Sequence, residues 1–249
     1  MKKFDSEFTH SYKTYSFGYC NYAKRETHDR LSDIYEGGYL PYSGAQNIED
    51  IFYMARSARV ALHNFSLSSE NRRIAKKFDG MFIRAQIPIK TFIADERAIS
   101  FCLAYFKKRH GARIMPRKRL MAILSSGLLS HVVVYKQDDA PIAYVLEVSD
   151  DTMTHFWFSF YDISLIRQSL GMWLFIDSAR VAQEQGKKYF YVGTVYGEKG
   201  IYKTNFKTIA YWDGTEWVND IPRLKSRSRS DHERIYDATD EWKEKHRLF

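Results

Sequence analysis

Residues with side chains suited to acid-base or acyl-transfer chemistry gather between positions 161 and 206. They are Tyr161, Asp162, Ser169, Gly171, Tyr202, Lys203 and Asn205. A carboxylate can hold an ammonium group and relay its proton, a phenol can donate to a developing oxyanion, and a lysine can bind phosphate. Each has a structural alternative: Asp162 could cap a helix, Lys203 could be solvated, and Gly171 could serve helix packing.

The elements around these residues follow a regular order. Periodicity predicts helices over 96–109 and 117–126, strands over 130–135, 140–148 and 153–160, and a long helix over 164–185. A strand over 188–192, a short helix within 197–205 and a strand over 208–212 complete the series. Residues before 94 mix short aromatic strands with turns and include a helix over 69–77. We therefore expect three segments: 1–94, 95–222 and a basic polar tail over 223–249.

The composition indicates a globular protein with a polyanionic partner. The chain has 249 residues and a formal net charge of +8, and 45% of its residues are hydrophobic. Apolar runs are too short to span a bilayer, and the polar N-terminus lacks a secretory signal, so we expect a cytoplasmic protein that does not enter a membrane.

Basic residues form two clusters that could follow a phosphate backbone. The candidates for contacts with a nucleic-acid backbone are Arg72, Arg73, Lys107, Lys108, Arg117 and Lys118. Such contacts would make affinity fall steeply with salt. The alternative is that these residues are solvated faces of helices.

Two cysteines, Cys20 and Cys102, are too few for a cysteine-rich metal site, and His63, His131 and His155 lack the spacing of metal ligands. We therefore predict no metal and no cofactor.

The order of elements resembles the core of the GNAT acyltransferases, which implies an α+β fold: an antiparallel meander, a long helix and splayed strands, with a smaller N-terminal α/β domain. In that family, pyrophosphate binds where the long helix begins, and the nearest match is Gln168-Ser169-Leu170-Gly171-Met172-Trp173. Trp173 occupies a position that must be small for backbone amides to reach a phosphate. The sequence therefore disfavours ordinary acetyl-CoA binding.

Four ordered motifs resemble the C-terminal domain of arginyl- and leucyl-tRNA-protein transferases: Tyr161-Asp162, Ser169-x-Gly171, Tyr189-x-Tyr191-x-Gly193 and Tyr202-Lys203-x-x-Phe206. Looser matches, such as Phe17-Gly18-Tyr19-Cys20, extend the resemblance to roughly residues 15–218. Of the family's cysteine cluster, associated with an iron-sulfur or zinc site, only Cys20 remains.

The resemblance implies transfer of an amino acid from aminoacyl-tRNA to the amine of an acceptor protein or peptide. Asp162 would orient the attacking amine and Tyr202 would donate to the ester or ribose, as catalytic residues. Tyr161, Ser169, Gly171, Lys203 and Asn205 would contact substrate, with Lys203 at the terminal phosphates. Two alternatives are a non-catalytic RNA- or peptide-binding relative and a CoA-dependent N-acyltransferase. The donated amino acid and the oligomeric state stay undefined.

Overall fold

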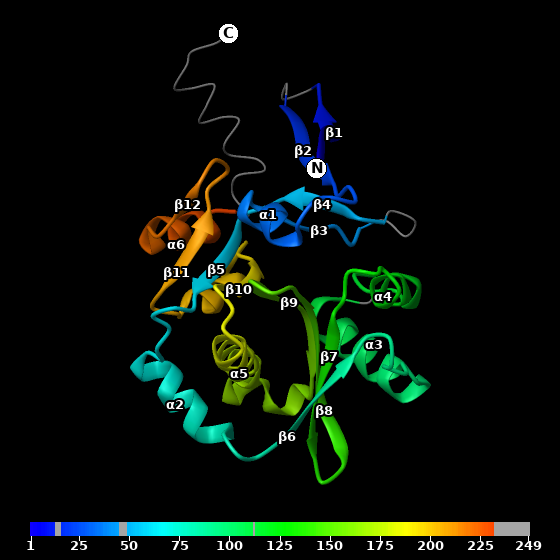
Figure 1. The fold of residues 1–249 in the computed structure, drawn as a ribbon, viewed down its shortest axis with the longest axis vertical. Coiled ribbons are helices and arrows are strands. Elements are labelled where there is room, and N and C mark those ends of the chain that lie inside the picture. The colour runs from blue at the N-terminus through cyan, green and yellow to red at the C-terminus, as the bar shows by residue number, and fades with distance from the viewer. Residues whose placement is uncertain (13–15, 45–48, 112, 232–249) are drawn as a thin grey trace.

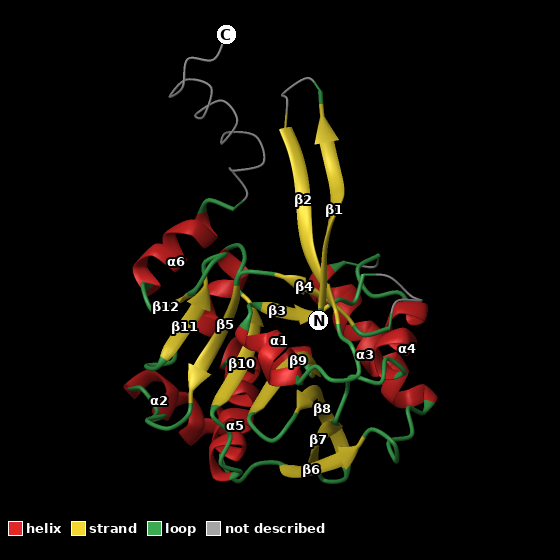
Figure 2. Ribbon diagram, turned by 45° about the horizontal axis from the view of Figure 1, so that its top comes forward, coloured by secondary structure: helices red, strands yellow, loops and turns green. Residues whose placement is uncertain are grey.

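The computed structural model describes residues 1–12, 16–44, 49–111 and 113–231 (Figure 1). An antiparallel sheet at the N-terminal end has the order β1-β2-β4-β3 and consists of β1 (Lys2–Ser11), β2 (Ser16–Lys24), β3 (Tyr39–Pro41) and β4 (Ile51–Met54). Only residues 22–24 of β2 pair with β4, so the rest of the β1–β2 hairpin projects from the molecule (Figure 2). Helix α1 (Leu31–Glu36) connects β2 to β3.

A second sheet forms the centre of the molecule. Its order is β12-β11-β5-β10-β9-β8-β7-β6. In chain order its strands are β5 (Ser57–Ala61), β6 (Ile83–Pro88), β7 (His131–Gln137), β8 (Ala140–Ser149), β9 (Met153–Tyr161), β10 (Tyr189–Thr194), β11 (Ile209–Trp212) and β12 (Trp217–Val218). Strands β7, β8 and β9 form the predicted antiparallel meander.

The parallel pair β9 and β10 opens along its length. Residues 189–191 of β10 pair with residues 153–155 of β9, and the later residues of these two strands do not pair with each other. Beyond that point β10 stays paired with β5, whereas β9 continues along β8. The two strands therefore diverge toward their C-terminal ends, as the predicted splay requires.

The helices lie where their apolar faces can be buried. Helices α3 (Glu96–His110) and α4 (Arg117–Leu124) lie beside the meander, and α3 contacts β9. Helix α2 (Ser69–Phe78), capped by the Ser68 hydroxyl, packs against α5 (Leu170–Glu184), which contacts β9 and β10. Most residues of α5 are buried, so it is the core helix that its sequence predicts. Among the described residues no helix is both long and apolar enough to cross a bilayer.

Three boundaries differ from the sequence prediction. The division at residue 94 does not separate the two sheets, because β5 and β6 precede it and pair within the central sheet. The helix expected over 164–185 is interrupted at Ser169, whose φ of 72° ends a 3₁₀ segment, Ile163–Gln168, before α5 begins. The polar tail expected from residue 223 begins as α6 (Ile221–Arg229), because Leu224 and Ser228 find buried positions. Residues 232–249 lie outside the described part of the chain.

Candidate active site

A pocket of about 400 Å³ lies where β9 and β10 diverge. Its walls come from β9, the end of β10, α3, α5 and a 3₁₀ segment, Glu198–Thr204. Aromatic side chains form much of the lining: Tyr105, Phe106, Phe156, Trp157, Phe158, Tyr161, Phe175, Tyr196 and Tyr202. The separation of two paired strands thus creates a cavity in a sheet that would otherwise be closed.

Lys203 is the cation placed most deeply at this site. Its Nζ donates to the backbone oxygen of Thr194 at 3.0 Å and lies 5.9 Å from the centre of the Phe175 ring. Burial lowers the pKa of Lys203 to about 8, because an ammonium loses hydration when it is enclosed. A large fraction of these side chains is therefore charged at neutral pH, beside an apolar wall.

Tyr161 and Tyr202, two of the predicted site residues, both line the pocket. The Tyr161 ring lies 4.8 Å from that of Tyr105, and the Tyr202 ring lies 6.0 Å from that of Phe175. Burial, and then the neighbouring Tyr161, raise the pKa of Tyr202 above its ordinary value. Its phenol stays protonated at neutral pH and can act as a hydrogen-bond donor.

Further cationic groups surround the pocket. Arg109 and His110 reach it from α3, and Lys199 reaches it from the 3₁₀ segment. Burial, followed by the charges of Arg109 and Lys199, lowers the pKa of His110. None of the residues that line the pocket carries a carboxylate. The site therefore favours anionic groups together with apolar groups.

The loop before Lys199 is anchored from two distant parts of the chain. The Tyr196 hydroxyl accepts from the backbone nitrogen of Arg56 at 2.8 Å, and the Arg56 guanidinium lies 4.3 Å from the Tyr196 ring centre. Asp231, just after α6, pairs with Arg56 and accepts from the Gly197 backbone nitrogen at 2.7 Å. These contacts fix the wall that carries Tyr196 and Lys199.

Two predicted site residues lie outside the pocket. Asp162 is exposed and accepts from the Ser164 backbone nitrogen at 2.9 Å, so its observed contact is the capping alternative. Asn205 is exposed, and its backbone oxygen accepts from the Asn71 side chain at 2.9 Å. Asp162 follows Tyr161, the last residue of β9, and Asn205 follows Thr204, the last residue of the 3₁₀ segment, so both lie just outside the elements that line the pocket.

Ser169 and Gly171 do not line the pocket either. A Cβ placed on Gly171 would lie 2.7 Å from the Tyr161 hydroxyl oxygen, so the glycine makes room for that phenol. The first residues of α5 are buried, and the Met172 and Trp173 backbone nitrogens already donate to the Ser169 oxygen at 3.0 and 3.1 Å. The expectation that acetyl-CoA does not bind at this helix start stays a prediction.

The basic residues proposed for tRNA contacts fall into two groups. Arg72 and Arg73 lie on α2, on the other side of the molecule from α3 and α4, which carry Lys107, Lys108, Arg117 and Lys118 (Figure 1). Some of these charges have acidic partners: Arg73 pairs with Glu70 at 2.7 Å and Arg117 pairs with Glu96 at 2.5 Å. Lys107 and Lys108 directly precede Arg109, which lines the pocket, so they lie at the C-terminal end of α3 next to the pocket.

Sequence reasoning missed several residues of this region. Tyr105, Phe156, Phe175 and Lys199 line the pocket without belonging to any motif that marked them. His155, set aside because it lacks metal-ligand spacing, is fully enclosed on β9 beside Lys203. These residues come from α3, β9, α5 and the 3₁₀ segment, which only the tertiary structure brings together, so no local signal could have identified them.

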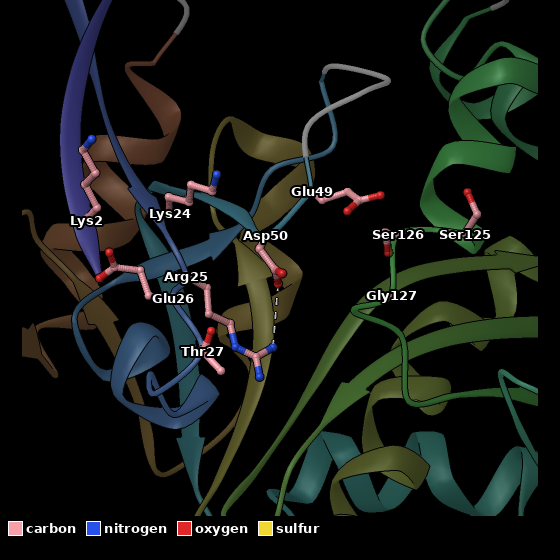
Figure 3. A pocket seen from close by; sticks show the side chains of 10 residues that line it. All are labelled: Lys2, Lys24, Arg25, Glu26, Thr27, Glu49, Asp50, Ser125, Ser126 and Gly127. Carbon is pink, nitrogen blue, oxygen red and sulfur yellow. Dashed lines mark ion pairs between the residues drawn. The ribbon is translucent and has the colours of Figure 1, made fainter.

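A second, wider cleft of about 890 Å³ separates the base of the β1–β2 hairpin from the end of α4 (Figure 3). Its lining is polar and carries both signs of charge, including Arg25 and Asp50, which lie 3.8 Å apart. None of the predicted site residues lines it. Cys20 lies on β2 and Cys102 is buried in α3, and the described residues contain no cluster of three or more potential metal ligands. The prediction that the protein holds no metal stays a prediction.

The chain is similar in sequence to proteins of known families. A family model described as an acetyltransferase (GNAT) domain matches residues 72–207. An aspartate/glutamate leucyltransferase of Dinoroseobacter shibae is 31% identical over 194 residues, 71% of this chain and 66% of that protein, so the match spans just under two thirds of the relative.

Another aspartate/glutamate leucyltransferase, from Hyphomonas neptunium, is 25% identical over 72% of this chain and 76% of that protein. Among solved structures, FemX is similar with a TM-score of 0.44 and 7% identity, over 66% of this chain and 59% of FemX.

Proposed function

Because this chain belongs to the GNAT acetyltransferase family, we propose that its pocket performs acyl transfer, with an amino acid carried by tRNA as the acyl group. Two relatives named aspartate/glutamate leucyltransferase support a donor of this kind. The covered start of α5 argues against acetyl-CoA, and the basic end of α3 offers contacts for a polyanion. An aminoacyl ester is already activated, so positioning supplies much of the rate.

The observation that carries the proposal is the chemistry of the pocket. Aromatic walls suit an apolar side chain such as that of a leucyl donor. Arg109, Lys199 and Lys203 would repel an arginyl donor, because none of the lining residues offers a compensating carboxylate. The same cations would attract an acceptor whose first residue is Asp or Glu. We therefore propose a leucyl-type donor and an acidic acceptor N-terminus.

The reaction forms one bond and breaks one bond. The acceptor α-amine attacks the ester carbonyl, a C–N bond forms, and the ribose oxygen leaves with a proton while the amine loses one. An α-amine has a pKa of roughly 7.7–8.0, so a useful fraction is neutral near pH 7.5 without a strong base. Lys203 would stabilise the developing oxyanion or the terminal phosphate, and Tyr202 would donate to the leaving oxygen.

Charged tRNA and short peptides test this proposal directly. Purified protein is mixed with tRNA carrying labelled leucine or labelled arginine, and with peptides that begin with Asp, Glu, Ala or Lys. We expect label from leucyl-tRNA on the Asp and Glu peptides, and at least a 10²-fold lower rate for Lys203→Met. Absence of label on every peptide would overturn the transferase proposal and favour a binding protein.

The pattern of label separates the parts of the proposal. Transfer of arginine in preference to leucine would contradict the donor assignment alone. Transfer to the Lys peptide at the rate of the Asp peptide would contradict the acceptor assignment. Lys207→Met is a suitable control, because Lys207 is exposed and does not line the pocket.

A further inference from the structure

His155 lies behind the pocket and links it to the N-terminal sheet. Its side chain is 1% exposed. The Nδ1 atom lies 2.9 Å from the Tyr35 hydroxyl oxygen, and the two rings meet edge to face at 5.4 Å. Tyr35 belongs to α1 and is itself completely buried. The imidazole therefore has a fixed orientation that a residue outside the central sheet determines.

The other ring nitrogen faces a small space beside Lys203. A Cβ built on Gly193 would lie 3.6 Å from His155 Nε2 and 3.7 Å from Lys203 Nζ. Gly193 has a φ of 79° and lies at an irregularity in the pairing of β10 with β5. Because residue 193 has no side chain, the imidazole nitrogen and the lysine ammonium border the same space.

The charge states of the two groups make their proximity favourable. Burial, and then the charge of Lys203, lower the pKa of His155 to about 3, so the imidazole is neutral. A neutral imidazole has one donor nitrogen and one acceptor nitrogen. An ammonium on the Nε2 side favours the tautomer with the proton on Nδ1, which then donates to the Tyr35 oxygen. Nε2 is left as an acceptor beside Gly193, where Lys203 Nζ also lies.

We propose that His155, held by Tyr35, is a positioning residue that fixes the Lys203 side chain and stabilises its charged form. Helix α1, which connects β2 to β3 of the N-terminal sheet, would then contribute to the assembly of the pocket. Only the catalytic consequence of this proposal rests on the proposed function.

The other charged or titratable groups around Lys203 supply no carboxylate to stabilise its ammonium. Those that face it are Arg109 and His110 from α3, Lys199 and Tyr202 from the 3₁₀ segment, and Tyr161 from β9. The arginine and the lysine are cations, and the raised pKa of Tyr202 keeps its phenol protonated at neutral pH. The Thr194 backbone oxygen is the one acceptor recorded for Nζ among the described residues. Loss of the imidazole should therefore favour the neutral amine of Lys203.

The ionisation of Lys203 can be measured in the whole protein without any substrate. The rate at which acetic anhydride acetylates Lys203 is followed by mass spectrometry as a function of pH, with exposed Lys76 as the internal reference. We expect His155→Leu to lower the midpoint for Lys203 by about one pH unit, since hydrogen bonding to a charged form favours that form. Tyr35→Phe should lower it by a smaller amount, and His155→Gln, which keeps an acceptor, should restore part of the shift.

An unchanged midpoint in folded His155→Leu protein would overturn the proposal. If that variant does not fold, Tyr35→Phe decides, because it removes a single hydroxyl group. The matched control is Tyr39→Phe, which alters a buried tyrosine on β3, the strand that follows α1, and should leave the midpoint in place.

The pH profile of transfer provides a second measurement. If Lys203 acts as a cation, kcat/KM should fall as the pH rises through the pKa of Lys203. His155→Leu should shift this alkaline limb of the profile to lower pH by the same amount as it shifts the acetylation midpoint. Failure of the proposed function would appear as absence of transfer by the wild type, with the acetylation shift still present. Failure of the present inference would appear as active variants with unshifted midpoints and limbs.

Discussion

Gly171 lies so close to Tyr161 that a Cβ on the glycine would be 2.7 Å from the phenol oxygen and 3.1 Å from the adjacent ring carbon. The start of α5 therefore packs directly against the Tyr161 side chain. Since Tyr161 also lines the pocket, the glycine acts on the site through this side chain.

Gly171→Ala should destabilise the protein by about 1–3 kcal/mol, because the added methyl group forces either the phenol or the helix to move. In a Tyr161→Phe background the loss should be smaller, since the nearest atom is then absent. Urea unfolding of the four proteins in a double-mutant cycle measures the difference. Equal losses in both backgrounds would show that the crowding lies elsewhere.

Asp162→Ala should cost about 1 kcal/mol of stability, because Asp162 caps the Ser164 backbone nitrogen. Asp162→Asn retains an acceptor and should change stability by only a few tenths of a kcal/mol. Neither variant should lower turnover per folded molecule substantially, because Asp162 does not line the pocket. Thermal unfolding and initial rates check both statements. An Asp162→Asn protein that is as stable as the wild type but turns over 10²-fold more slowly would show that Asp162 takes part in catalysis.

Lys203→Met should make the protein more stable at pH 7, on the order of 1–3 kcal/mol, because it removes a buried cation whose pKa burial lowers to about 8. Between about pH 8 and the ordinary lysine pKa near 10.5, the unfolded chain holds a proton that the native protein has lost. Wild-type stability should therefore gain a contribution from Lys203 as the pH rises through this window, and the variant should lack it.

Urea unfolding of wild type and Lys203→Met from pH 7 to pH 10 tests this dependence, with Lys207→Met as the exposed control. A variant that is less stable than wild type at pH 7 would contradict it.

Lys107→Ala and Lys108→Ala together should weaken tRNA binding and reduce the salt slope by up to about two, since each phosphate contact contributes roughly one. Arg73→Ala should have a smaller effect, because Arg73 already pairs with Glu70 and lies on the far helix α2. Fluorescence anisotropy with labelled tRNA at several salt concentrations measures the affinity and its dependence on salt. An unchanged slope in the Lys107/Lys108 variant would identify these side chains as a solvated face.

The sequence alone determined the elements whose signals are local. Strand alternation predicted the meander, and apolar spacing predicted α5 apart from its first turn. There the left-handed backbone of Ser169 separates a 3₁₀ segment from the helix. Ser68 and Asp95 cap α2 and α3 with their own side chains, which is a contact between residues three apart. The motifs also predicted Tyr161, Tyr202 and Lys203 as residues of one site, and all three line one pocket, while their roles stay predictions.

Only the tertiary structure decided which side chains reach that pocket and what surrounds them. Asp162 follows Tyr161 directly, yet it faces solvent, because the chain turns away from the sheet at that residue. The environment of Lys203 depends on contacts between distant parts of the chain. His155 comes from β9, and Tyr35, which orients His155, lies 120 residues before it. Burial and orientation are properties of contacts between distant segments, and a pattern of neighbouring residues does not contain them.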